Sequence, residues 1–145
     1  MKTSLCALLA LTLAASAAQA SPSPTPGEKE TIDKLIAPSL AALKAGKSRE
    51  AVEVFLGSNA LMSGKSSDIA FLASQIDSMI GIYGPISDCQ LSETRNNGAL
   101  VEQRLYHCQH RYLVTRWIFL SVKTSTGWAG ANLSYDDKVM NALGE

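Results

Sequence analysis

The chain has 145 residues, of which 46% are hydrophobic and 18% are charged, and its 13 basic residues balance its 13 acidic ones. This length and composition fit one globular domain and exclude a largely disordered chain. Because Lys and Arg form no cluster, the sequence lacks the basic face that binds a nucleic-acid backbone or anionic lipid, so neither is expected as a partner.

The first twenty residues have the pattern of a secretory signal peptide. A basic start at Lys2 precedes an apolar run over 5–18, and an A-x-A sequence ends at Ala20. We expect cleavage after Ala20 and export to the bacterial periplasm or outside the cell. The apolar run is short for a membrane span, and no later stretch suits one. The Pro-rich segment 21–27 should be an extended tether before a single domain over 28–145.

Apolar stripes at helical spacing predict two or three helices between residues 28 and 83. Pro38 should kink the first helix, over 28–45, or split it near Ala37. A second helix is expected over 49–56, and a third over 68–83, where Gly84 and Pro85 end it. The long apolar stripe of the third helix suggests that it is the main helix covering the sheet.

From residue 86 onward, β-branched and aromatic runs alternate with short Gly, Asn and Ser segments. This pattern predicts four consecutive antiparallel strands over 86–95, 100–108, 112–123 and 128–135. The third strand has apolar residues on both faces toward its end, so we expect it to be central with both faces covered. A short helical turn over 138–143 should follow. The predicted fold class is α+β, with helices packed on a curved four-stranded antiparallel meander.

Charge pairing selects a register for the first two strands. One register places Glu93 opposite Arg104 and Arg95 opposite Glu102, which pairs opposite charges. A slip of two residues would place Glu93 against Glu102, which is unfavourable. We therefore expect the first register.

The same register places Cys89 opposite Cys108, within reach of a disulfide bond. These are the two cysteines that remain after the leader is removed, and an oxidising compartment favours their pairing. Because no C-x-x-C motif is present, we interpret this disulfide as a structural staple with no redox role.

The order of these elements, and the Trp-x-Phe, Gly-Trp and Tyr-Asp-Asp sequences within 116–137, resemble small exported bacterial proteins of the NTF2-like (cystatin-like α+β) superfamily. The resemblance covers about residues 28–135. It implies a pocket between the curved sheet and the long helix. Such folds include isomerases, dehydratases, ligand-binding proteins and dimerisation modules, so the resemblance does not define a function.

No catalytic motif, cofactor loop or metal-ligand spacing is present in the sequence, so no catalytic residue, cofactor or metal is predicted. His107 and His110 would fall on opposite faces of a strand, which does not suit two ligands of one metal, and we interpret both as surface or rim residues. Tyr112 and Arg116 share a strand face. Together with His107 and Trp128, they are the candidate pocket-lining residues.

We therefore expect a non-catalytic exported binding or interaction protein, which takes a small apolar ligand or a protein partner as a monomer or homodimer. One alternative is a pocket enzyme of the isomerase or hydrolase type, in which an Asp or His acts with Tyr112 and Arg116. Another is a periplasmic inhibitor or immunity protein.

Overall fold

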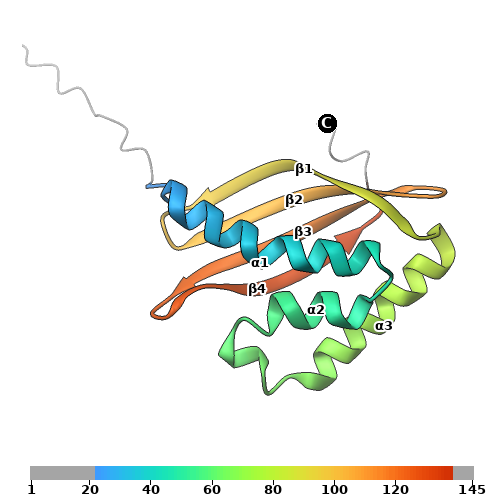
Figure 1. Ribbon diagram of the computed structural model, residues 1–145, viewed down its shortest axis with the longest axis horizontal. Helices are drawn as coiled ribbons and strands as arrows, with labels where there is room; N and C mark the ends of the chain where they lie inside the picture. The colour runs from blue at the N-terminus through green and yellow to red at the C-terminus, as the bar shows by residue number, and fades with distance from the viewer. Residues whose placement is uncertain (1–21, 139–145) are drawn as a thin grey trace, which may run out of the picture.

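The computed structural model describes residues 22–138, so the predicted signal peptide and nearly all of the predicted final helical turn lie outside the described residues. The helices lie on one face of a single sheet (Figure 1), which confirms the predicted α+β fold class. The elements in chain order are α1 (Pro26–Lys44), α2 (Ser48–Leu56), the 3₁₀ helix η1 (Ala60–Met62), α3 (Ser66–Tyr83), β1 (Ile86–Asn97), β2 (Val101–His110), β3 (Val114–Thr124) and β4 (Gly127–Asp136).

The four strands follow one another across the sheet, and each neighbouring pair is antiparallel, as predicted for a meander. On β3, Trp117 and Phe119 are fully buried among the helices, on what we call the inner face. The residues of β3 that alternate with them on the outer face, such as Ile118 and Leu120, are only half-buried. The third strand is therefore central, as predicted, but the helices cover only one of its faces.

Helix α1 begins at Pro26, so the predicted tether ends two residues earlier than expected. The backbone N–H and the hydroxyl of Thr25 both donate to the Glu28 carboxylate, at 2.8 and 3.0 Å. This contact satisfies a free N–H group at the helix start, and a proline in the first turn needs no hydrogen-bond partner. The predicted split near Ala37 is wrong, because α1 continues through Pro38. Buried residues on both sides of Pro38 hold the helix against the core.

Figure 1 shows α1 lying along the sheet. Helix α1 contacts β1 and β4, α2 contacts β4, and α3 packs mainly on α2. The interpretation of the third helix as the main cover of the sheet is therefore wrong, since α1 has that position. The core joins the layers through Phe55 of α2 and Phe119 of β3, whose rings meet edge to face at 5.0 Å.

Cys89 faces Cys108 across β1 and β2 and forms the predicted disulfide bond, with the two Cα atoms 4.0 Å apart. Beyond Leu91, however, a bulge shifts the register of the hairpin. Glu93 then lies opposite Leu105, and the predicted charge pairs across the strands are wrong.

Each predicted charge pair is replaced by a pair within one strand. Glu93 binds Arg95 at 2.5 Å on the surface of β1. Arg104 binds Glu102 at 2.6 Å on the inner face of β2. Arg104 also donates to the Asp33 carboxylate of α1, so this arginine joins β2 to the helix above it. Glu102 is fully buried and Arg104 is 4% exposed, which makes this an interior ion group.

Candidate functional site

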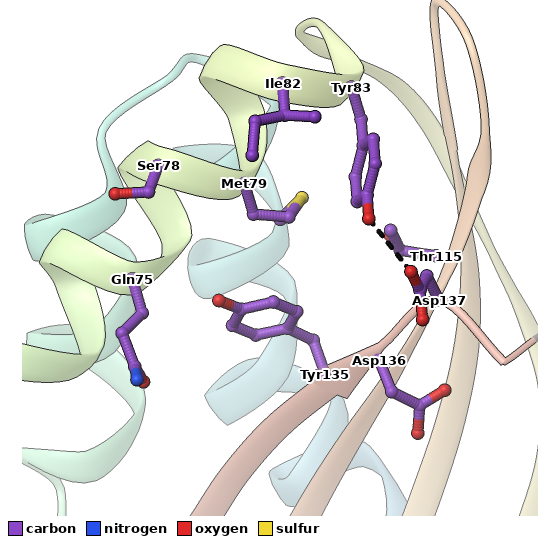
Figure 2. Close-up of a pocket in the computed structure, with 9 residues that line it drawn as sticks. All are labelled: Gln75, Ser78, Met79, Ile82, Tyr83, Thr115, Tyr135, Asp136 and Asp137. Carbon is purple, nitrogen blue, oxygen red and sulfur yellow. Dashed lines mark hydrogen bonds between the residues drawn. The ribbon is translucent and has the colours of Figure 1, made fainter.

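A pocket of about 410 Å³ lies between α3, the start of β3 and the end of β4 (Figure 2). This volume falls within the range of roughly 300–1,000 Å³ that is usual for small-molecule sites. The described residues that line it are Gln75, Ser78, Met79, Ile82 and Tyr83 from α3, Thr115 from β3, and Tyr135, Asp136 and Asp137 from the end of β4.

The α3 wall follows from helical spacing, since Gln75, Ser78, Met79 and Ile82 recur every three or four residues and so share one side of the helix. Met79 is buried and Ile82 is exposed, so this wall runs from the core to the surface. Its apolar side chains can pack against a ligand, while the amide and hydroxyl groups beside them can form hydrogen bonds.

Tyr135 forms the opposite wall. Its ring stacks on the fully buried Trp117, with ring centres 5.0 Å apart and planes at 30°. Figure 2 shows its side chain pointing toward α3. Burial raises the pKa of Tyr135, so its phenol stays neutral at physiological pH. The ring is therefore a fixed aromatic surface with a neutral hydroxyl group.

At the rim, the Tyr83 hydroxyl donates to the Asp137 carboxylate at 2.9 Å. This hydrogen bond to an anionic acceptor raises the pKa of Tyr83. The bond joins the last turn of α3 to the chain just after β4, between residues 54 positions apart. It closes one side of the pocket.

The negative charge of the neighbouring Asp136 carboxylate is balanced by a salt bridge and a backbone hydrogen bond. Arg116 donates to it at 2.7 Å, and the backbone N–H of Lys138 donates at 3.0 Å. Burial alone would raise the pKa of Asp136, but these bonds outweigh it and hold the pKa below its usual value. Arg116 thus forms a salt bridge with Asp136. Asp137 takes part in no salt bridge among the described residues, and its partner is the Tyr83 hydroxyl.

Thr115 belongs to a buried hydrogen-bond chain beneath the pocket. The Trp117 indole N–H donates to the Thr115 hydroxyl oxygen at 2.8 Å, and that oxygen lies 2.8 Å from His110 Nε2. The other His110 nitrogen, Nδ1, lies 2.8 Å from the carbonyl oxygen of Gly84, so Nδ1 carries the proton. His110 Nε2 is then free to accept the proton of Thr115.

This chain overturns the interpretation of His110 as a surface residue, because its side chain is buried. A hydroxyl group beside an imidazole is also the geometry of an activated nucleophile. Thr115, however, is fully buried and its oxygen already accepts the Trp117 N–H. The arrangement therefore acts as a structural link between β3, β2 and the residue that ends α3. Gly84 permits this approach, since its φ of 86° is left-handed and a Cβ there would meet Arg111 Cβ at 2.8 Å.

The four candidate pocket-lining residues lie in different places, and none is among the residues lining the 410 Å³ pocket. Tyr112 is 70% exposed on the β2–β3 connection, with the Arg111 guanidinium 5.3 Å from its ring centre. Trp128 is buried on β4, in the core beneath the helices.

His107 and Arg116 are the two candidates that the structure brings together. They face each other across β2 and β3 on the outer face of the sheet. His107 lines a smaller hollow of about 190 Å³ there, with Asp88, Gln90, Gln109 and Val114. Arg116 reaches the larger pocket only indirectly, through its bond to Asp136.

Sequence reasoning missed the aromatic residues of the pocket, Tyr83 and Tyr135. Both stand next to strong sequence signals, since Tyr83 precedes the Gly-Pro that ends α3 and Tyr135 precedes two aspartates. Aromatic residues at the ends of a predicted helix and a predicted strand could thus have indicated the pocket.

Within residues 22–138, no group of three His, Cys, Asp or Glu side chains is placed to hold a metal ion. None of the helices in this part of the chain is long and apolar enough to cross a membrane.

Two solved structures have folds similar to that of this chain. The chain is similar to a domain of unknown function with a cystatin-like fold from Nostoc punctiforme, with a TM-score of 0.56, 10% sequence identity, and coverage of 82% of this chain and 83% of that one. It also matches an NTF2-like protein with a cystatin-like fold from Novosphingobium aromaticivorans, with a TM-score of 0.48, 14% identity, and coverage of 82% and 90%. No family model and no curated protein matches the chain.

At these identities the likeness concerns the fold alone. The chain therefore has the cystatin-like α+β fold, as the sequence resemblance implied.

Proposed function

We propose that the mature chain is an exported, non-catalytic binding protein that holds a small, largely apolar ligand in the pocket between α3, the start of β3 and the end of β4. The observation that carries this proposal is the pocket itself, about 410 Å³ in volume, with Met79 and the rings of Tyr83 and Tyr135 among its walls. A few polar groups among apolar and aromatic walls are typical of sites that bind small molecules.

Two features support export. The leader over 1–20 has the order of basic start, apolar run and cleavage site that secretion requires. The Cys89–Cys108 disulfide bond is of the kind that persists in oxidising compartments.

The contacts of Tyr112 and Arg116 favour binding over catalysis. An isomerase or hydrolase of the kind considered above needs both side chains at one cavity, beside a carboxylate or an imidazole. Tyr112 instead lies in solvent on the β2–β3 connection, and Arg116 lies on the outer face of the sheet, bound to Asp136. The pair therefore supplies no acid–base partner for a bound substrate.

A titration of the mature chain with phenethyl alcohol, a neutral one-ring compound, tests the proposal. We expect amide and side-chain NMR shifts to concentrate at Ile82, Tyr83 and Tyr135. Substitution of the pocket-lining Ile82 by Trp should weaken binding several-fold by narrowing the mouth. Phe71 is an equally exposed residue of α3 outside the pocket lining, so Phe71→Trp is the matched control and should leave binding unchanged. Equal effects of the two variants would contradict the proposal.

The outer face of the sheet supports a second proposal, that two copies of the chain associate through it. Leu105 of β2 lies on this face, where it pairs with Ile118 of β3 and is 8% exposed. It does not belong to the core beneath the helices. Ile118, Leu120 and Val122 of β3 share this face and are half-buried. A continuous apolar strip without a covering helix is a common feature of contact surfaces.

Light scattering during size-exclusion chromatography tests this second proposal. We expect a dimer mass that Leu120→Glu reduces to the monomer mass. Leu61→Glu is the control, since Leu61 is exposed in η1, which is not part of the sheet, and should keep the dimer. A monomer at every concentration of the unsubstituted chain would exclude self-association through this face.

A further inference from the structure

We propose that the pocket between α3 and β4 takes a positively charged amine with an apolar body, in preference to an anion of the same shape. This inference rests on the proposed function of the pocket as a ligand site. It concerns which ligands the site accepts, and it follows from the charges and rings at the rim.

The ionised groups among the described lining residues are both carboxylates. Asp136 and Asp137 line the pocket, and no Lys, Arg or His is among these residues. Arg116 pairs with Asp136 and offsets its charge. The Asp137 carboxylate is exposed, and its hydrogen-bond partner is the neutral hydroxyl of Tyr83. Of the two lining carboxylates, Asp137 is therefore the one without a salt bridge to a cation.

The Asp137 carboxylate can accept further hydrogen bonds but has none to donate. An ionised carboxylate accepts at several positions, and Tyr83 occupies one of them. An ammonium group brings up to three N–H donors and a positive charge, so it fits this position. A carboxylate or phosphate would bring further acceptors and a like charge.

The aromatic walls favour the same ligand class. Tyr83 and Tyr135 both line the pocket, and Figure 2 shows their side chains on different sides of it. Cations are attracted to the face of an aromatic ring, and an apolar body gains from contact with Met79 and Ile82. The ammonium group would thus lie at Asp137 and the apolar body against α3.

A matched set of three compounds tests this inference. Phenethylamine, phenethyl alcohol and phenylacetate share a ring and nearly the same length, but differ in charge at neutral pH. NMR titration of the mature chain should give the tightest binding for the amine and the weakest for phenylacetate. Because Asp137 is exposed to solvent, we expect the amine to bind about fivefold more tightly than the alcohol, and this advantage should shrink as salt is added.

Two variants locate the effect. Asp137→Asn keeps an acceptor for Tyr83 but removes the charge, so it should abolish the preference for the amine over the alcohol. Asp77→Asn removes an exposed carboxylate of α3 outside the pocket lining and should change neither affinity. Phenylacetate binding as tightly as the amine would overturn the preference for amines and leave the pocket proposal intact. If none of the three compounds shifts pocket resonances, both proposals fail.

Discussion

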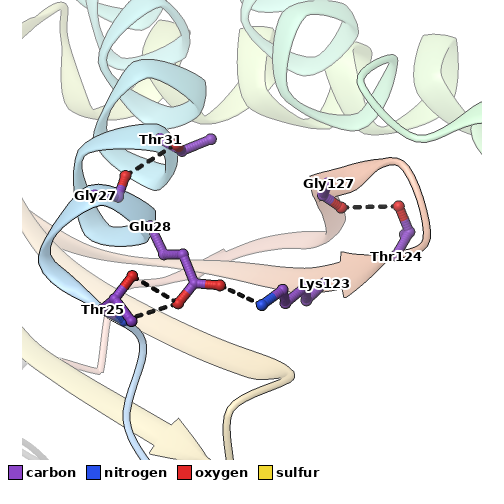
Figure 3. Close-up of polar contacts among 7 residues, drawn as sticks. All are labelled: Thr25, Gly27, Glu28, Thr31, Lys123, Thr124 and Gly127. Carbon is purple, nitrogen blue, oxygen red and sulfur yellow. Dashed lines mark hydrogen bonds and ion pairs between the residues drawn. The ribbon is translucent and has the colours of Figure 1, made fainter.

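Lys123, near the end of β3, donates a hydrogen bond to Glu28 in the first turn of α1, across 95 positions of sequence. Figure 3 shows the same carboxylate accepting from the backbone and the hydroxyl of Thr25. One side chain thus caps the helix and fastens it to the sheet. The Lys123 hydrogen bond, followed by the bonds from Thr25, lowers the pKa of Glu28 from 4.5 to about 2.

This depressed pKa predicts a specific loss of stability in acid. A carboxylate with a lowered folded-state pKa stabilises the fold above its unfolded pKa and loses that effect as the pH falls through its folded pKa. Replacement of Glu28 by Gln removes the contribution. The difference in free energy of unfolding between the wild type and Glu28→Gln should be constant above pH 4.5 and shrink as the pH falls toward 2. Urea unfolding across this range measures it.

Glu30 provides the control for that experiment, because its ion pair with Lys34 is on the exposed surface of the same helix. Exposed pairs of this kind contribute little, so Glu30→Gln should give a small difference at every pH. Parallel stability curves for the wild type and Glu28→Gln would show that the contact with Lys123 does not persist in solution.

The disulfide bond should contribute about 3 kcal/mol to stability, because it closes a loop between residues 19 positions apart and restricts the unfolded chain. We expect a double substitution of Cys89 and Cys108 by Ala to lower the urea midpoint accordingly. Dithiothreitol should lower the midpoint of the wild type and leave that of the double variant unchanged. A wild-type midpoint that reductant does not alter, with both thiols confirmed as free, would contradict this role.

The β1–β2 hairpin shows what local patterns can predict. The pairing of Cys89 with Cys108 was correct because a disulfide bond needs the two residues close together, and both lie on the side of the bulge where the predicted register holds. The charge pairing failed because it considered only partners on the neighbouring strand for Arg104. Arg104 lies on the inner face, where its second partner is Asp33 of α1, 71 positions earlier. No local pattern reveals such a contact.

The pocket illustrates the same limit. Each of its elements was predicted with nearly correct bounds, but its shape depends on how the end of α3 meets the start of β3 and the end of β4. The contact that closes it, between Tyr83 and Asp137, spans 54 positions. Tyr112 was proposed as a pocket residue because it shares a predicted strand face with Arg116, but β3 begins only at Val114 and Tyr112 lies in solvent.

The interior ion group makes single and double substitutions behave differently. Arg104→Met would leave the fully buried Glu102 without its cationic partner, and we expect a loss of about 3–5 kcal/mol. Replacing both residues, as Arg104→Met with Glu102→Leu, removes the unpaired charge and should be less destabilising than Arg104→Met alone. Urea unfolding of the two single variants and the double variant gives the coupling energy. If the two single losses simply add, the pair is not coupled in the folded state.

The Thr115 hydroxyl should matter to stability through its two buried partners. Thr115→Val keeps the shape of the side chain but leaves the Trp117 N–H without an acceptor and His110 Nε2 without a donor. We expect a loss of about 1–3 kcal/mol in urea unfolding, the usual effect of leaving a buried polar group unsatisfied. Loss of the hydrogen bond should also move the indole N–H resonance of Trp117 upfield. Thr94→Val, at an exposed position of β1, is the control and should change neither measurement. An unchanged indole resonance in Thr115→Val would show that Trp117 does not donate to this hydroxyl.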